Sequence, residues 1–281
     1  MERSVRIAND DDAENKLEKI DGQDDSLRTV MLGWCGIDQV ERVLRILFTK
    51  RHWRCRLEIY NKVVVPIPEL LWELVNLEEL VIQAIGLKSI SPLISRLVRL
   101  KKLSAGQNPL NVFPEAVCQL TQLESLGIDT CRFTSLPSSF ASLRNLQSLW
   151  LAQNKFDVFP SVICELRNLK NLSLRFNKFS WLPSSFANLQ ELVHLDLGAN
   201  CFKEFPRVVC ELPNLESLDL DGNELSELPL AITKLMRLKW LRLNENSFAR
   251  FPLFLGDLSR LSVFWPWSRF HLLVSIYLAY N

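Results

Sequence analysis

A histidine and an aspartate in alternation are the residues of this sequence that come closest to an acid–base pair. His194 and Asp196 flank Leu195, and residues two apart in a strand point to the same side. The other histidines are His52 and His271, and no serine or cysteine nucleophile motif accompanies them. Because a lone His–Asp pair is more often a surface hydrogen bond, we predict no catalytic residues and no enzymatic activity.

Cofactor and metal motifs are also missing from the sequence. It contains no G-x-x-x-x-G-K-[ST] phosphate loop and no G-x-G-x-x-G after a strand. The 7 cysteines lack the C-x-x-C spacing of common zinc sites. Asp196, Asp219 and Asp221 do not match a calcium-binding loop. We therefore expect neither a cofactor nor a metal.

Composition restricts the class of partner and the compartment. The formal net charge is +1 over 281 residues, whereas binding through phosphates needs a surplus of Lys and Arg. No run of 18 apolar residues is present, so no membrane span is expected. The N-terminal residues lack the apolar core of a secretory signal. With an odd number of cysteines, these features predict a cytoplasmic protein that binds no nucleic acid.

A period of 23 residues organises most of the chain, through the pattern Leu-x-x-Leu-x-Leu-x-x-Asn. Leu146, Leu149, Leu151 and Asn154 begin a regular series that ends with Leu238, Leu241, Leu243 and Asn246. Earlier units keep the leucines and replace the Asn, by Cys131 in one and by Ile85 in another. A proline column shares the phase: Pro68, Pro114, Pro137, Pro160, Pro183, Pro206, Pro229 and Pro252. Two columns in register predict a stacked repeat architecture.

The physical chemistry of one unit dictates how the units assemble. Leu-x-Leu alternation makes a short strand whose leucines point to one side. A single unit cannot bury these leucines by itself, so neighbouring units must stack. The Asn is expected to turn inward and bond loop backbone, and the Pro begins a return segment. We predict an α/β solenoid, a horseshoe with a parallel sheet on its concave face and short helices or 3-10 turns on its convex face.

The return segments alternate between two forms, FPSVICEL and LPSSFASL. Cys118, Cys164 and Cys210 therefore recur two units apart, in the first form. Strands lie about 4.8 Å apart, so these cysteines should be about 10 Å apart, too far for a disulfide. We predict free thiols that fill the core.

The residues between the leucines should point outward and form columns along the sheet face. Trp150, Phe176 and Trp240 place aromatic rings there, and aromatic residues and Arg are the usual energetic anchors of interfaces. Asp196, Asp219 and Asp221 form an acidic group that suits a basic partner, although these side chains could instead only pair with one another. The predicted binding residues on the concave face are Trp150, Arg175, Phe176, His194, Asp196, Asp219, Asp221, Trp240 and Arg242.

The unit L-x-x-L-x-L-x-x-N-x-h-x-x-h-P-x-x-h-x-x-L, where h is apolar, resembles the 23-residue, Leu-Pro class of intracellular leucine-rich repeats. It is similar to the repeats of the Ras-group scaffold proteins, Scribble and Erbin, over about Leu57–Leu261. This resemblance implies a non-enzymatic adaptor in signal transduction that holds a protein partner, such as a small GTPase, on its concave face. The alternative is a regulatory or substrate-recognition subunit of a ubiquitin ligase or phosphatase. Immune-type ligand sensing is a third possibility.

The ends of the chain depart from the repeat. Residues 1–27 are polar and acidic, which predicts a disordered tail. Residues 28–56 should form an N-terminal cap, with a helix over about 38–48 that Asp38 and Glu41 open as a capping box. The repeats follow over 57–261. Residues 262–281 break the phase at Pro266 and Arg269, which predicts an irregular loop and a late tenth strand around Leu273–Asn281. A disordered or splice-altered tail and contact with a membrane are the alternatives for this end.

Overall fold

The computed structural model describes residues 3–8, 12–20, 26–33, 35–50, 52–60, 66–250, 252–258, 260–261 and 263–264. The chain divides into two compact units, Met1–Arg132 and Phe133–Asn281. Each unit is built from parallel strands that pair in chain order, with short helices between them. In the part of the chain that the structure describes, no helix is long and apolar enough to cross a membrane.

The described residues of the first unit form six strands and five helices. The strands are β1 (Arg3–Ile7), β2 (Leu27–Gly33), β3 (Arg54–Tyr60), β4 (Leu77–Val81), β5 (Lys102–Ser104) and β6 (Ser125–Gly127). Two α-helices, α1 (Ala13–Glu18) and α2 (Ile37–Thr49), precede three 3-10 helices, η1 (Glu69–Glu73), η2 (Pro92–Arg96) and η3 (Glu115–Gln119). The two α-helices belong to the N-terminal part, where the 23-residue period has not yet begun.

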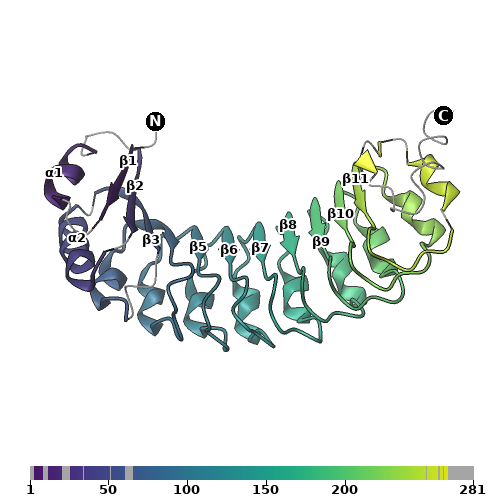
Figure 1. Ribbon diagram of the computed structural model, residues 1–281, viewed down its shortest axis with the longest axis horizontal. Coiled ribbons are helices and arrows are strands. Elements are labelled where there is room, and N and C mark those ends of the chain that lie inside the picture. The colour runs from purple at the N-terminus through teal and green to yellow at the C-terminus, as the bar shows by residue number, and fades with distance from the viewer. Residues whose placement is uncertain are drawn as a thin grey trace. The chain divides into compact units, whose positions relative to one another are not determined.

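The described residues of the second unit form short repeats of strand and 3-10 helix. Its strands are β7 (Ser148–Trp150), β8 (Asn171–Ser173), β9 (His194–Asp196), β10 (Ser217–Asp219), β11 (Trp240–Arg242) and β12 (Val263–Phe264). Its 3-10 helices are η4 (Ser138–Ser142), η5 (Ser161–Glu165), η6 (Ser184–Asn188), η7 (Arg207–Glu211), η8 (Leu230–Lys234) and η9 (Leu253–Asp257). The strands and the 3-10 helices lie on opposite sides (Figure 1). The predicted fold class, a parallel-sheet solenoid with short helices or 3-10 turns, is confirmed.

The core lies between the strands and the return segments. Leu149, Leu172 and Leu195 are buried at the centres of successive strands. Behind them, the rings of Phe156 and Phe179 stack with centroids 6.1 Å apart. Burying each such side chain stabilises the fold by about 2 kcal/mol, so the summed contribution of the stack supports strands of only three residues.

The alternation of the return segments is visible in the packing. At the first of two adjacent positions, Phe140 and Phe186 are buried in η4 and η6, whereas Ile163 and Val209 occupy the equivalent places in η5 and η7. At the second position the order of size is reversed, because Ala follows each Phe and Cys follows each Ile or Val. Large and small side chains thus alternate between neighbouring repeats, which keeps the core filled.

The repeated Asn turns inward, as predicted, and bonds the backbone of two repeats. The Asn200 Nδ2 donates to the carbonyl oxygens of Leu174 and Leu197, each at 3.0 Å, and its Oδ1 accepts the backbone N–H of Phe179 at 3.1 Å. Asn177 and Asn223 repeat this arrangement. In the place of the Asn, the Cys131 thiol donates to the carbonyl oxygens of Ala105 and Asp129. Buried backbone groups that water cannot reach are satisfied in this way.

The N-terminal region differs from the sequence-based expectation. The prediction of a disordered tail over 1–27 is wrong for Arg3–Ile7, which forms β1 and pairs with β2, and for Ala13–Glu18, which forms α1. Alternation in Arg3–Ile7 buries Ile7, and Asp12 caps α1 by accepting the backbone N–H of Asn15. The acidic composition masked these short apolar signals.

Two further corrections concern helix and strand ends. The N-cap of α2 is Gly36, which makes no side-chain cap bond, so the predicted capping box at Asp38 and Glu41 is wrong. At the other end, β12 (Val263–Phe264) pairs with β11 in the phase of the repeat, although Pro266 led us to expect that phase to fail. A two-residue strand ends before the proline, which removes the conflict. The predicted loop and late strand over 265–281 lie outside the described residues.

We expect Asn200→Ala to lower the free energy of unfolding by about 3 kcal/mol, because it leaves buried carbonyls and an N–H without partners. Urea unfolding followed by circular dichroism measures the loss. Asn168→Ala is the matched control, since Asn168 is exposed and donates only to the Arg144 carbonyl. A loss in Asn200→Ala no larger than in the control would contradict the role of the inward Asn.

All 7 cysteines are free, and only Cys201 is exposed, which confirms the prediction for Cys118, Cys164 and Cys210. Burial raises the pKa of the Cys55 thiol to about 12 and that of the Cys131 and Cys210 thiols to about 11. Because the thiolate is the reactive form, we expect a thiol reagent at neutral pH to label one cysteine quickly in the folded chain. Cys201→Ser should abolish the fast phase of labelling, and unfolding in urea should make the six buried cysteines react quickly as well. Rapid labelling of a second cysteine in the folded chain would contradict this assignment.

Candidate functional site

All nine of the residues predicted to bind a partner belong to strands of the second unit or to the turns that follow them, and they lie on the outward side. Parallel pairing places Trp150 beside Ser173, Ser173 beside Asp196, Asp196 beside Asp219, and Asp219 beside Arg242. This row contains one residue from each strand from β7 to β11. Adjacent members are about 4.8 Å apart, so the row is about 19 Å long. We call the surface formed by the outward residues of these strands and of the turns that follow them the strand face.

Three aromatic rings are exposed on the strand face. Trp150 and Trp240 are each 38% exposed, and Phe176 is 48% exposed. Phe176 lies in the turn after β8 with a φ of 54°, a left-handed conformation shared by the residue before each inward Asn. Exposed rings of this size are the anchors that interfaces use most.

Two of these three rings already have a cation over them. The Arg175 guanidinium lies 4.9 Å from the centroid of Phe176, and the Lys239 ammonium lies 5.7 Å from that of Trp240. Among the described residues, no cation lies over the ring of Trp150. Trp150 is therefore the one exposed ring of the strand face whose surface is available to a cation from a partner.

Two of the three predicted acidic residues are covered rather than open. Asp219 Oδ1 lies 3.5 Å from Arg175 Nη1, and Asp219 Oδ2 lies 3.2 Å from Arg242 Nη1. Asp221 Oδ2 lies 3.3 Å from Arg242 Nε, and both aspartate residues are buried, with side chains that are 13% and 10% exposed. Arg175 and Arg242 thus reach across the strands and pair with Asp219 and Asp221, which is the alternative that the sequence left open for these side chains.

Asp196 keeps more of its charge toward solvent. Its nearest cation is Arg175 Nη1, at 3.8 Å, and its side chain is 31% exposed. Ser173 Oγ donates to Asp196 Oδ2 at 3.2 Å, and the backbone N–H of Gly198 donates to Oδ1 at 3.0 Å. These two neutral donors fix the direction of the carboxylate without cancelling its charge.

Burial sets the protonation behaviour of Asp219. Burial raises the pKa of this carboxyl above its usual range, and the neighbouring carboxylates of Asp221 and Asp196 raise it further. The backbone N–H of Asp221 donates to Asp219 Oδ1 at 2.9 Å and acts in the opposite direction, as does Arg242. The charged form of Asp219 is thus less favourable in the folded chain than in water.

A shallow depression of about 400 Å³ lies on the strand face. Ser173 and Ser217 contribute small side chains to its surface, and Trp150 and Arg242 stand on outer strands of the row. Asp196 and His194, which share one side of β9, also line it. The remaining lining residues are Asn171, Leu172, Leu195 and Asp219. Ser173 lies in the row between Trp150 and Asp196, whereas Ser217 lies outside the row and pairs with His194 and Trp240. Both serines, which the sequence analysis did not select, are small beside these larger neighbours and leave room for the depression.

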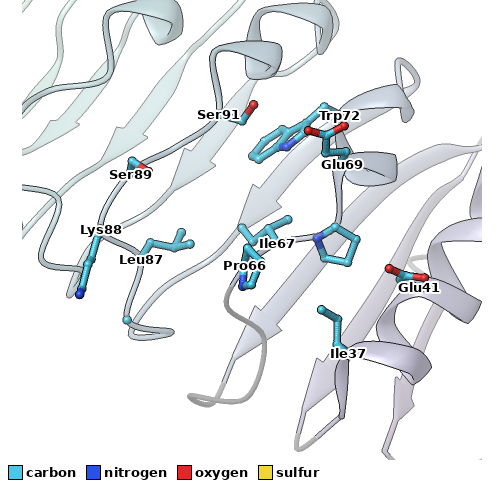
Figure 2. A pocket seen from close by; sticks show the side chains of 12 residues that line it. Ile37, Glu41, Pro66, Ile67, Glu69, Trp72, Leu87, Lys88, Ser89 and Ser91 are labelled. Carbon is cyan, nitrogen blue, oxygen red and sulfur yellow. The ribbon is translucent and has the colours of Figure 1, made fainter.

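The first unit contains a second pocket, of about 600 Å³, that the sequence did not indicate (Figure 2). It lies between the beginning of α2, the beginning of η1 and the loop after β4 (Figure 2). Ile37, Ile67 and Leu87 contribute apolar side chains, and Glu41 and Lys88 stand at its rim. The other residues that line it are Pro66, Pro68, Glu69, Trp72, Gly86, Ser89 and Ser91. Trp72 and Leu87 are buried, so these two side chains serve the core of the unit.

Charges on the strands of the first unit are balanced. Arg54 Nε lies 2.8 Å from Glu78 Oε1, and Lys101 Nζ lies 3.3 Å from Glu78 Oε2. Arg56 pairs with Glu79 in the same way. Arg54 and Arg56 are therefore partly neutralised by the acids of β4. Among the described residues, the exposed aromatic rings of the strand face lie in the second unit.

Comparison with known proteins agrees with the repeat. Residues 111–200 match the family model described as "Leucine-rich repeat region", and residues 182–225 match the model described as "Leucine rich repeat". No curated protein matches the sequence.

Several solved structures are similar to this chain. An internalin from Listeria monocytogenes has a TM-score of 0.57 at 18% identity, with 84% of this chain and 78% of that chain covered. The plant peptide hormone receptor RGFR1 in complex with RGF2 has a TM-score of 0.61 at 21% identity, and 95% and 47% are covered. The ectodomain of a membrane receptor kinase from Arabidopsis thaliana has a TM-score of 0.52 at 22% identity, with 84% and 34% covered. At these identities the likeness shows the fold, and this chain spans less than half of the two plant receptors.

Asp219→Asn should change how stability depends on pH. Since burial keeps the pKa of Asp219 above its ordinary value of 3.8, the folded chain binds this proton more tightly than the unfolded chain. The contribution of Asp219 to the free energy of unfolding therefore falls as the pH rises from 3.8 through the folded pKa. We expect the variant to gain stability relative to the native chain over that interval, in urea unfolding series at pH 4 to 7. If the free energy of unfolding of the variant instead falls relative to that of the native chain as the pH rises, the ion pairs with Arg175 and Arg242 outweigh the effect of burial on Asp219.

Proposed function

We propose that this leucine-rich-repeat protein binds a protein partner through the strand face of its second unit, and that it does so without catalysing a reaction. The observation that carries the proposal is the exposure of Trp150, Phe176 and Trp240 on one face of a rigid sheet. Strands held in register by the core present these rings at fixed spacing. A preorganised surface loses little conformational entropy when a partner binds.

The charges of the strand face support a polar and specific contact. Asp219 and Asp221 hold Arg175 and Arg242 in place through ion pairs, and Arg242 remains half exposed. An arginine fixed in this way can form bidentate bonds to a partner with little further loss of freedom. Aromatic anchors with fixed charges around them are the composition expected of an interface rather than of a solvated surface.

Structures of similar fold add support of a general kind. Two of them are complexes, one of a plant peptide hormone receptor with RGF2 and one of a receptor ectodomain with Casparian strip integrity factor 2. A solenoid of this type can therefore hold a polypeptide ligand. Fold alone does not select the ligand, so the partner of this chain depends on its own strand face.

The finer proposal follows from the resemblance to the Leu-Pro class of repeats. On that basis the chain is a scaffold in cytoplasmic signal transduction, and a small GTPase is the first partner to test. The alternative, a recognition subunit of a ubiquitin ligase or phosphatase, uses the same strand face and differs only in what is recruited. Identification of the captured partner separates the two.

Removal of the aromatic rings tests the proposed function. We expect Trp150→Ala, Phe176→Ala and Trp240→Ala together to weaken binding of a partner by at least about a hundredfold, since each anchor contributes about 2 kcal/mol. Affinity capture with the native chain, identification by mass spectrometry and titration by calorimetry with the purified partner provide the measurement.

Trp181→Ala is the control for this experiment. Trp181 is 53% exposed, but it lies in the turn before η6 rather than on a strand. Its removal should leave the affinity within about twofold, as expected for an exposed residue outside the interface. Equal losses in the control and in the triple variant, or no loss in either, would refute the strand face as the binding surface.

A further inference from the structure

We infer that the depression on the strand face is a slot for one arginine side chain of the partner, held between the ring of Trp150 and the carboxylate of Asp196. This inference rests on the proposed function and specifies the chemistry of the bound group. Three independent features of the strand face carry it: a ring over which no described residue places a cation, a carboxylate with a single long ion pair among the described residues, and a small residue between them.

The ring of Trp150 has a free place for a cation. Phe176 and Trp240 are covered by Arg175 and Lys239, at 4.9 and 5.7 Å. The described part of the chain supplies no such cation to Trp150. Tryptophan is the aromatic side chain that attracts a cation most strongly, and Arg is the cation found over it most often.

Asp196 supplies the residual negative charge. Three carboxylates, Asp196, Asp219 and Asp221, face two guanidinium groups, so the cluster keeps one unit of negative charge. Asp219 has ion pairs at 3.5 and 3.2 Å, whereas the one ion pair that Asp196 makes with the described residues is at 3.8 Å. The excess charge therefore lies at Asp196, the more exposed of these two carboxylates.

Ser173 sets the width of the slot. It pairs with Trp150 on one side and with Asp196 on the other, so these two residues are about 10 Å apart along the row. The serine side chain fills little of this space and also directs Asp196 by its bond to Oδ2. A planar guanidinium above Ser173 can stack on the ring and present two N–H groups to the carboxylate.

The arginines of the chain itself leave the slot open. Arg175 does not line the depression. Its guanidinium lies over Phe176 and against Gly198, where a Cβ would overlap with Nη1. Arg242 lines the depression from β11, but it is held by Asp219 and Asp221. Arg175 is thus absent from the lining, and Arg242 is engaged by two carboxylates toward the β11 end of the row.

A library of random twelve-residue peptides, selected on the full chain, tests the slot directly. We expect the selected peptides to share an arginine. Replacement of that arginine by citrulline, which keeps the shape and removes the charge, should weaken binding at least about tenfold, as expected for a cation over an aromatic ring that also meets a carboxylate. Lysine in the same place should bind more weakly than arginine.

Variants of the chain locate the effect. In Trp150→Ala and in the isosteric Asp196→Asn, the arginine and citrulline peptides should bind with affinities within about threefold of each other. Trp181→Ala should keep the full difference, because Trp181 lies in the turn before η6 and does not line the depression. Thermal unfolding of each variant checks that the fold is intact, and both substitutions are at the surface of the sheet.

Selected peptides without a shared arginine would overturn the slot, and so would a citrulline penalty that persists in Asp196→Asn. Either result leaves the proposed function intact if the triple aromatic variant still loses its partner. Conversely, a partner whose affinity is unchanged in the triple aromatic variant refutes the proposed function, whatever the peptides show. The two failures are therefore distinguishable.

Discussion

The inward Asn is the interaction on which the rest of this structure depends. Each Asn bonds backbone groups of its own repeat and of the repeat before it. These bonds fix the register between neighbouring repeats. A strand of three residues therefore cannot shift by one position without breaking several buried hydrogen bonds. A fixed register is what brings Trp150, Ser173 and Asp196 into one row.

The fold and the row of outward residues could be predicted from the sequence, but the ion pairs among the charged side chains could not. Leucines at a constant period determine which residues point outward, so the position of Trp150 or Asp196 follows from counting. Whether Asp219 is open or covered depends on how far Arg175 and Arg242 extend, and long side chains are not fixed by a period. For the same reason the depression was missed, since it arises from two serines among larger neighbours. The strand β1 was missed because its apolar residues are few and stand next to acidic ones.

The residues that form the core of this protein are separate from those that form the strand face. Leucines, prolines and inward asparagines supply the stack, and they leave the outward positions unconstrained by packing. Proteins of about 20% identity can then share this architecture and carry unrelated outward residues. The partner of this chain is consequently determined by its own outward residues, and the candidate binding residues among them lie on β7 to β11 and the turns that follow.

The alternation of Phe–Ala and Ile–Cys return segments affects how such a protein can change in length. Phe186 of η6 packs edge-on against Phe159, 5.4 Å away, next to the smaller side chains of η5. Deletion of one repeat would join two segments of the same form, which leaves a void in one case and a clash in the other. Deletion or duplication of two repeats preserves the order. Relatives of this chain that gain or lose repeats should therefore do so in steps of 46 residues, and their binding rows would lengthen or shorten by two strands at a time.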